Sequence, residues 1–317
     1  MTSPFAGLRV VLVAAFNRRY HRSGLALAAA LEALGCEVGR CEERQRVWNA
    51  ALRRRLMSRL TARLRRRAVD VVLVFKGASL APGDVVELRR QFGGRWVNWF
   101  PDDPHDHETS TRLAPVYDRF FTHDSSSLPR YRAAGVRAHY LAFGCDPAYL
   151  RPFPPDARWA SPLVFVGSRD AVRDPVLEEL TAFGLVAWGP GWPRGPLYGT
   201  RYVKALAGAS VGVNVHRQFG EHGDPARYGT GANMRVFEFA AVGTPQVSDA
   251  KQDVARHFKP DQEIVLYTCV GELKDHARTL LGDDALRCRL ATAARERALR
   301  EHTWRHRLEE LLTVTLR

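Results

Sequence analysis

The chain has 317 residues, of which 45% are hydrophobic and 26% are charged. This composition is typical of a globular protein and excludes collagen, a coiled coil and an intrinsically disordered chain. The length suits two domains or one large one, with a core that needs no disulfide or structural metal. The five Cys residues lack zinc-type spacing, which favours reduced thiols in a cytoplasmic compartment.

The charge is strongly basic. There are 47 basic and 34 acidic residues, a formal net charge of +13, and the basic residues are 42 Arg and only 5 Lys. Such a chain attracts phosphates, nucleic acid and anionic lipid through long-range electrostatics. A skew towards Arg and Ala also reflects coding bias, so the charge permits these partners without identifying one.

The first half of the chain alternates buried strands with helices. The apolar run Leu8–Ala14 is too short to span a membrane, and its charges follow it, so we expect a first strand rather than a signal peptide. A helix over Ser23–Leu34 follows, with Gly35 at its C-cap. Four more strands are expected, over Val69–Phe75, Arg95–Trp99, Arg119–Thr122 and His139–Ala142. This alternation predicts a parallel sheet.

A Pro-rich stretch over residues 153–160 interrupts the pattern and predicts a linker. Strands are then expected over Leu163–Val166, Leu185–Trp188, Val211–Val215, Thr244–Ser248 and Glu263–Tyr267. Helices are expected over Glu272–Leu281, Asp284–Arg300 and Trp304–Leu316. The predicted domains are residues 1–152 and 161–302, with a C-terminal helix in 303–317 that could pack back across them. The fold class is therefore α/β, with two Rossmann-like doubly wound domains facing a central cleft that binds ligands.

The segment Arg46–Arg67 holds nine Arg, and its Leu residues recur every four positions. This spacing predicts a helix with one apolar stripe and Arg on its other faces. A surface helix with solvated Arg is the simpler interpretation. The alternative is a contact for anionic lipid or a polyanionic acceptor, which would place the protein at the inner face of the membrane.

The block Gly229–Asp249, GTGANMRVFEFAAVGTPQVSD, carries the clearest chemistry. A Gly-rich loop leads into a helix, and the free N–H groups at a helix start bind phosphate. Glu238 on that helix could accept hydrogen bonds from ribose hydroxyls. An ordinary strand–helix unit with a solvated Glu is equally compatible with the spacing.

Several segments together resemble GT-B glycosyltransferases of the family-1/family-4 group, nearest to the CgeB-like (spore maturation protein) branch. The segment NMRVFEFAAVGTPQVSD resembles their nucleotide-binding motif, and LVFVGSRD and VGVNVH resemble the strands and loops before it. In the first half FPDDPHDH, YDRFFTHD, LPRYRAAGV and AFGCDP match in order, and HFKPDQEIVLY, ELKDHARTLL and EHTWRHRLEELL match the closing elements. The resemblance covers nearly the whole chain.

The resemblance implies a donor site in the second domain. Its expected residues are Gly167, Ser168, Arg169, Arg173, His216, Arg217, Asn233, Met234, Arg235 and Glu238. The related retaining enzymes grip the donor pyrophosphate with a basic pair, and Arg173 stands at the second of those positions. Ser168 replaces the first, with Arg169 beside it as a substitute. Thr230 stands where those enzymes carry the first of two Glu residues, and Glu238 matches the second.

In the first domain, polar residues follow the predicted third and fourth strands. Asp102, Asp103, His105, His107 and His123 are all possible metal ligands. GT-B enzymes do not in general depend on a bound metal, so no metal and no cofactor is expected. We expect catalytic roles for Asp103 and His123, together with Arg173, although helix or turn capping explains Asp103 equally well. The expected acceptor-side residues are His21, Ser23, Gly24, Asp102 and His105.

The resemblance implies sugar transfer from a nucleotide-diphosphate sugar, with retention of configuration and without metal. The acceptor is left open among a glycan, a protein, a lipid-linked glycan and a small molecule, with nucleic acid a less favoured partner. A GT-B epimerase or a phosphorylase is an alternative, but a phosphorylase needs a pyridoxal Lys and the chain offers few. A non-catalytic nucleotide-sugar or polyanion-binding protein on a degenerate GT-B scaffold is the other alternative, because Ser168 and Thr230 depart from the motif.

Overall fold

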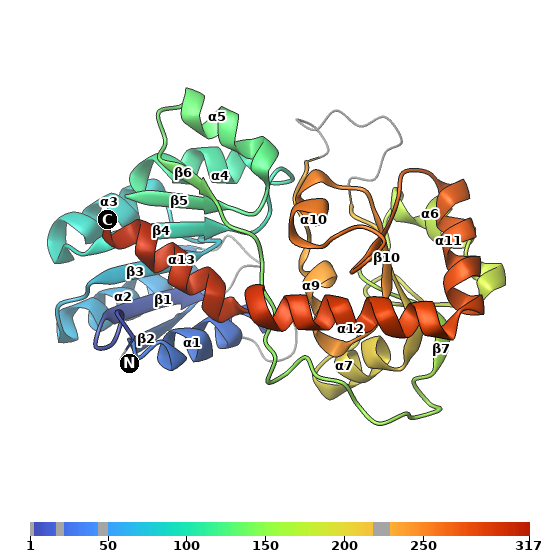
Figure 1. The fold of residues 1–317 in the computed structure, drawn as a ribbon. Coiled ribbons are helices and arrows are strands. Elements are labelled where there is room, and N and C mark those ends of the chain that lie inside the picture. The colour runs from blue at the N-terminus through green and yellow to red at the C-terminus, as the bar shows by residue number, and fades with distance from the viewer. Residues whose placement is uncertain (1–2, 17–21, 44–49, 218–228) are drawn as a thin grey trace. The chain divides into compact units, whose positions relative to one another are not determined.

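The computed structural model describes residues 3–16, 22–43, 50–217 and 229–317 (Figure 1). The chain forms two compact units. Unit 1 comprises Met1–Ala142 and Trp304–Arg317, and unit 2 comprises Phe143–Thr303. The units divide between Ala142 and Phe143, ahead of the predicted linker, so the Pro-rich stretch belongs to unit 2.

Unit 1 contains a six-stranded parallel sheet in the order β2-β1-β3-β4-β5-β6. Its strands are β1 (Arg9–Ala14), β2 (Glu37–Glu42), β3 (Val71–Phe75), β4 (Arg95–Phe100), β5 (Arg119–Thr122) and β6 (Ala138–Tyr140). The central strands β1 and β3 are continuous apolar runs because helices cover both faces of a parallel sheet.

The helices of unit 1 follow its strands, except for the last one. They are α1 (Ser23–Ala33), α2 (Ala50–Arg66), α3 (Pro82–Phe92), α4 (His107–Leu113), α5 (Leu128–Ala133) and α13 (Trp304–Leu316), with 3-10 turns at Ala114–Val116 and Ser125–Ser127. The C-terminal helix α13 packs against α1 and β4 (Figure 1). The ring of Trp304 meets that of Trp99 edge-on at 5.5 Å, which explains why this helix belongs to unit 1.

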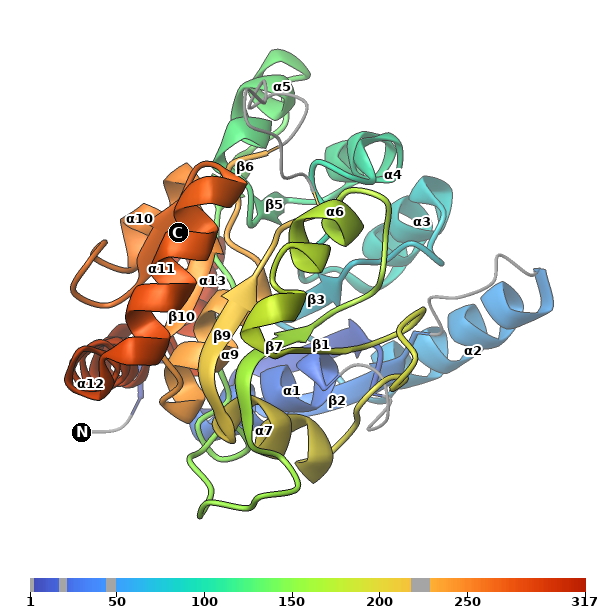
Figure 2. The ribbon, with the colours of Figure 1, turned by 90° about the vertical axis from the view of Figure 1, so that its right-hand side faces the viewer.

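Unit 2 contains a five-stranded parallel sheet in the order β11-β10-β9-β7-β8. Its strands are β7 (Ser161–Val166), β8 (Leu185–Trp188), β9 (Ala209–Asn214), β10 (Gln246–Asp249) and β11 (Val265–Tyr267). β7 and β9 lie side by side at its centre (Figure 2). Consecutive strands along the chain are thus not always neighbours, as in doubly wound folds.

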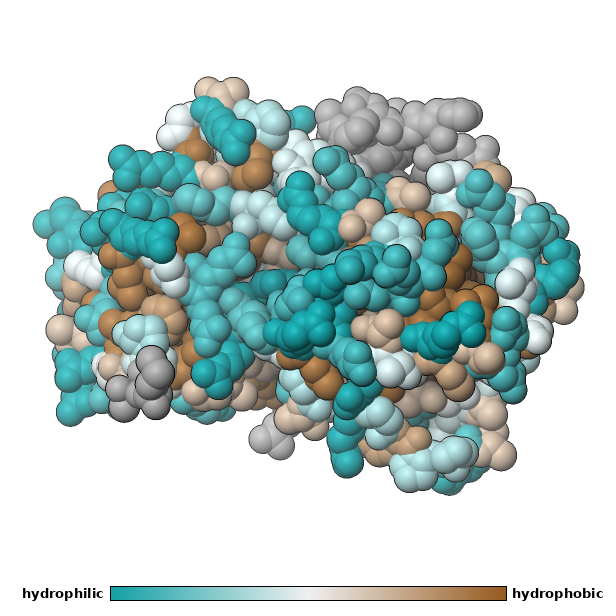
Figure 3. Space-filling view, in the orientation of Figure 1, coloured by the Kyte–Doolittle hydropathy of each residue, from teal (hydrophilic) through white to brown (hydrophobic). Residues whose placement is uncertain are grey.

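The helices of unit 2 are α6 (Arg173–Glu178), α7 (Thr200–Ala207), α9 (Met234–Val242), α10 (Gln252–His257), α11 (Val270–Gly282) and α12 (Asp284–Glu301), with a 3-10 turn at Thr181–Phe183. The long helix α12 packs on α9. Its buried residues Leu290, Ala294 and Ala298 recur every four positions and so form one stripe. The front of α12 is largely hydrophilic (Figure 3). No helix among the described residues is long and apolar enough to cross a membrane.

The predicted fold class is confirmed, with two parallel α/β units. The predicted ranges of β5, β8 and α13 match the structure, and the other predicted strands are shifted by a few residues. β2 was not predicted from the sequence, because this edge strand has three charged residues, Glu37, Arg40 and Glu42, and only one buried residue.

Candidate functional site

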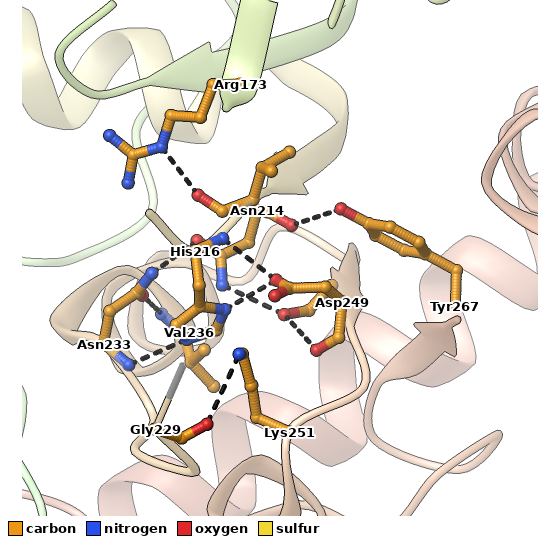
Figure 4. Close-up of polar contacts among 11 residues, drawn as sticks. Arg173, Asn214, His216, Gly229, Asn233, Val236, Asp249, Lys251 and Tyr267 are labelled. Carbon is orange, nitrogen blue, oxygen red and sulfur yellow. Dashed lines mark hydrogen bonds and ion pairs between the residues drawn. The ribbon is translucent and has the colours of Figure 1, made fainter. Parts of the chain in front are cut away.

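A buried His–Asp pair lies at the carboxyl ends of β9 and β10 in unit 2 (Figure 4). The ring Nδ1 of His216 is 2.6 Å from Oδ1 of Asp249, and the backbone N–H of His216 donates to the same oxygen at 3.1 Å. Nε2 of His216 accepts the backbone N–H of Asn233 at 3.1 Å. Both ring nitrogens of His216 therefore have a partner within unit 2. The pair therefore joins both strand ends to the segment that leads into α9.

Burial alone would raise the pKa of Asp249, but its interactions with His216, and the charge of Lys251, hold that pKa below its usual value. Lys251 also approaches the Gly-rich segment, because its Nζ donates to the carbonyl of Gly229 at 3.4 Å (Figure 4). Oδ2 of Asp249 is buried without a hydrogen bond to any described residue. Asp249 is thus an anion that depends on His216 for its stability.

Asn233 caps helix α9 and ties it to the sheet. Its side-chain Oδ1 accepts the N–H of Val236, as expected of an N-cap residue. Its Nδ2 donates to Oδ1 of Asn214 at 2.9 Å, and Asn214 in turn donates to Ser248 Oγ at 3.0 Å. Met234 is then the first helical residue. The start of α9 is therefore fixed by side chains from the ends of β9 and β10.

Arg173 lies at the start of α6, with a side chain that is only 10% exposed. Its Nε donates to the carbonyl of Val215 at 2.9 Å, and its Nη1 donates to the carbonyl of Ser168 at 3.1 Å (Figure 4). Burial lowers the pKa of Arg173 to about 10, although Asp170 acts in the opposite direction, so the side chain stays cationic at neutral pH. Nη2 makes no hydrogen bond to a described residue, so this edge of the guanidinium is available for an anion.

The loop after β7, which holds Gly167 and Ser168, is tightly packed. Gly189 has φ +142°, and a Cβ on it would lie 2.0 Å from the carbonyl oxygen of Gly167. Trp192 donates its ring N–H to that same oxygen at 3.0 Å. Arg169 lies over the Trp192 ring and pairs with Asp174 at 2.8 Å. This contact turns Arg169 towards a carboxylate in the first turn of α6.

Arg217, which follows β9, is more weakly held. Its side chain is 53% exposed and its Nε is 3.9 Å from Oδ2 of Asp170, the carboxylate that also pairs with Arg173. The structure thus brings Arg173 and Arg217 to one acidic residue, as expected for two cations at the same strand ends.

Glu238 on α9 has partners that the sequence analysis missed. Its Oε2 accepts hydrogen bonds from Arg235 Nη1 at 2.6 Å and from the hydroxyl of Tyr202 on α7. The guanidinium of Arg235 also lies over the Tyr202 ring. Burial raises the pKa of the Glu238 carboxyl, and Arg235 offsets this only in part. The contacts use Oε2, so no hydrogen bond from a described residue occupies Oε1.

Thr230 stands where the related enzymes carry a further Glu, and it is buried. Its hydroxyl donates to Oδ2 of Asp253 at 3.1 Å. Because Asp253 is itself fully buried, this carboxylate does not replace the missing Glu as an exposed ligand group.

In unit 1, Asp103 is the centre of a buried network. Its side chain has no exposed surface, and its two oxygens accept from Ser110 Oγ at 2.8 Å and Tyr131 OH at 2.7 Å. His107 approaches Oδ1 at 3.3 Å. Burial would raise the pKa of Asp103, but the hydrogen bonds together outweigh it and lower that pKa. These contacts satisfy Asp103 within unit 1, and a catalytic role for it stays a prediction.

The other predicted residues of unit 1 lie in different environments. Asp102 pairs with Lys76 at 2.5 Å, His105 is exposed and His123 is buried. Ser23 begins α1, and Gly24 is buried, where a Cβ would lie 2.4 Å from the Ala15 carbonyl oxygen. His21 lies outside the described residues. Within the described ranges, no three His, Cys, Asp or Glu residues gather as a metal site. The predicted catalytic residues Asp103 and His123 lie in unit 1 and Arg173 lies in unit 2, so their joint role stays a prediction.

Known proteins resemble this chain in sequence family and in fold. Residues 169–313, somewhat less than half of the chain, match a family described as glycosyl transferase-like. No curated protein matched the chain by sequence. A sucrose-phosphate synthase from Thermosynechococcus elongatus is structurally similar, with a TM-score of 0.66 at 12% identity over 97% of this chain and 98% of that one. The chain has the GT-B fold.

Two further GT-B structures are similar over nearly the full length. Anabaena HepE in complex with UDP-glucose gives a TM-score of 0.65 at 12% identity, over 97% of this chain and 100% of that one. The lipopolysaccharide outer core galactosyltransferase WaaB, in its apo form, gives 0.60 at 12% identity, over 97% and 99%. At such identity the likeness establishes the fold, and the CgeB-like branch stays a prediction.

Proposed function

We propose that this chain is a glycosyltransferase that moves a sugar from a nucleotide-diphosphate sugar to an acceptor. The observation that carries the proposal is Arg173, a buried cation that two backbone carbonyls hold and that Asp170 pairs with, while its Nη2 makes no hydrogen bond to a described residue. A fixed cation at the carboxyl ends of parallel strands suits a diphosphate, because such sheets bind ligands there. The match to a glycosyl transferase-like family and the neighbour bound to UDP-glucose support the donor class.

In the proposed reaction, the bond between the sugar C1 and a diphosphate oxygen breaks, and the oxygen keeps the electron pair. A bond forms between C1 and an acceptor oxygen, whose proton passes to the departing diphosphate. Arg173 would stabilise the negative charge that grows on the diphosphate, and a charge held in place beforehand needs no reorganisation. The positive end of the α9 dipole adds to this effect. Retention of configuration and independence of metal are parts of the same proposal.

The nucleoside end of the donor is assigned to α9. Glu238 keeps Oε1 unoccupied by the described residues while Arg235 and Tyr202 hold Oε2. A carboxylate held in this way can accept a ribose hydroxyl without losing side-chain freedom on binding. The His216–Asn233 contact fixes the start of the same helix, so both ends of the donor would bind to one rigid frame.

The test is release of nucleoside diphosphate from a panel of UDP-, GDP-, ADP- and dTDP-sugars by the purified protein, with and without a mixture of acceptor glycans. We expect release from at least one donor, and Arg173→Gln should abolish it. Arg158→Gln is the matched control, because Arg158 is an exposed Arg of unit 2 paired with Asp156. Absence of turnover with every donor, or equal loss in both variants, would contradict the proposal.

A non-catalytic nucleotide-sugar-binding protein is the second candidate. It is favoured by Thr230, which is buried against Asp253 where the related enzymes carry a Glu. A nucleotide sugar that raises the thermal midpoint without being consumed would support this candidate, since a ligand of the folded state stabilises it whether or not it reacts.

A further inference from the structure

An arginine-lined groove lies in unit 1, between helix α2 and the edge strand β2. It has a volume of about 360 Å³, at the lower end of the range for small-ligand sites. Its lining residues come from β2 (Arg40, Cys41 and Glu42) and from α2 (Arg59, Ala62, Arg63 and Arg66). Figure 2 shows α2 as a long helix beside α1 and β2.

The helix presents its Arg residues in a fixed direction. Leu56, Leu60 and Leu64 are all buried against the sheet, which confirms the predicted apolar stripe. The lining residues Arg59, Arg63 and Arg66 have the spacing i, i+4 and i+7, so they form one neighbouring stripe of the helix. The apolar contacts of one stripe therefore set the orientation of the other.

The groove carries unbalanced positive charge. Arg40 pairs with Glu32, whereas Arg63 donates to the Arg40 carbonyl, a contact that neutralises nothing. Within the part of the chain that the structure describes, Arg59 and Arg66 have no carboxylate partner. Glu42 is the one acidic residue of the lining and accepts the N–H of Phe16. Three Arg without a carboxylate partner thus share the lining with one carboxylate, and a bound anion would relieve their mutual repulsion.

The floor of the groove is neutral. Burial raises the pKa of the Cys41 thiol to about 11, although Arg63 and Arg59 act in the opposite direction. A neighbouring groove of about 220 Å³ shares Arg63 and Arg66, but there Glu37 pairs with Arg67 and lies close to Arg9. Among the described residues, the first groove therefore holds three Arg without a carboxylate partner, and the second holds two of these three.

We propose that the groove between α2 and β2 binds a small soluble phosphate compound of diphosphate type. The planar guanidinium fork matches phosphate oxygens two at a time, and several Arg on one stripe can engage more than one phosphate. A concave site of this size suits a discrete molecule better than a membrane surface. The proposal concerns unit 1 and does not depend on the donor site of unit 2.

The test uses two variants with the same change in charge on the same helix. In the groove variant, Arg59→Gln and Arg66→Gln remove two of the unpaired cations. In the control, Arg54→Gln and Arg55→Gln change two exposed Arg residues that do not line the groove. Inorganic pyrophosphate is titrated by calorimetry into each protein. The same titration in an Arg173→Gln background removes binding at the proposed donor site.

We expect the groove variant to bind pyrophosphate at least about tenfold more weakly in that background, while the control stays within about twofold. Circular dichroism checks that α2 is intact in both. An equal loss in both variants would mean a general charge effect and would overturn the proposal. The proposal would also be overturned if the wild-type protein bound no pyrophosphate, or if it bound only vesicles of anionic lipid. This result does not depend on the proposed donor site, because both variants are compared in the Arg173→Gln background.

Discussion

The contact between His216 and Asp249 predicts a large loss of stability in His216→Ala. The substitution removes the Nδ1–H that Asp249 accepts at 2.6 Å and leaves a carboxylate that is 3% exposed with only a backbone donor. Breaking a buried pair on one side costs roughly 3–5 kcal/mol, because an uncompensated charge stays behind. At about 2–4 °C per kcal/mol for a unit of this size, the thermal midpoint should fall by roughly 6–20 °C.

The second partner supplies the control. In the double variant His216→Ala with Asp249→Ala the stranded charge is gone, so part of the stability should return, and the two effects should be strongly non-additive. Nucleotide affinity should still fall in both variants, because Asn233 loses the acceptor of its backbone N–H. Calorimetric unfolding of the four proteins forms the cycle. Additive changes, or a His216→Ala midpoint within about 2 °C of wild type, would refute the reasoning.

The remaining predictions concern the two residues proposed to bind the donor, the buried Asp103 of unit 1 and the expected independence of metal. Arg173→Ala should weaken a nucleoside diphosphate at least about tenfold and leave the nucleoside within about twofold, measured by calorimetry. Glu238→Gln should weaken the binding of nucleoside and of nucleotide sugar alike, by about 1–3 kcal/mol, because charge-assisted hydrogen bonds become neutral ones. If the variant binds both ligands as tightly as wild type does, the ribose binds elsewhere. Asp103→Asn should be less stable than wild type at neutral pH. Because folding lowers the pKa of Asp103, its contribution to stability is present above the unfolded-state pKa and is lost as the pH falls through the folded-state pKa. Acid-unfolding curves of the two proteins should therefore converge at low pH. Transfer should survive excess EDTA, and activity that returns only with Mn²⁺ or Mg²⁺ would contradict a metal-independent reaction.

The sequence predicts most of the fold because burial leaves a local signature. Strands β1 and β3 are covered on both faces, so their residues are continuously apolar and need no knowledge of their neighbours. The edge strand β2 has no such signature, because charged residues interrupt its sequence EVGRCE at three of six positions. In the sheet, β2 pairs with β1 alone, and this pairing joins Arg9 to Glu37, which is 28 residues later in the chain.

Site residues can be predicted from the sequence only as far as their chemistry is local. Arg173 follows the first predicted strand of the second domain, and Glu238 lies on the helix predicted after the Gly-rich loop, so motif and topology together place them in unit 2. Their partners are set by the tertiary fold. Tyr202 is on another helix, 36 residues from Glu238, and nothing in the sequence TRYVKALA marks it as the donor of a hydrogen bond to α9.

Asp103 illustrates why chemistry alone cannot assign a role. An Asp after a strand can be a catalytic base, a metal ligand or a cap, and the side chain is the same in each case. What separates these roles is the number of lone pairs left for a substrate. In the structure one oxygen accepts from Ser110 and the other from Tyr131, and neither is exposed. Glu238 differs, because both of its protein contacts fall on one oxygen. The carboxylate with an oxygen to spare is therefore the better candidate to touch a ligand, and that distinction depends on contacts 28 and 36 residues apart in the chain.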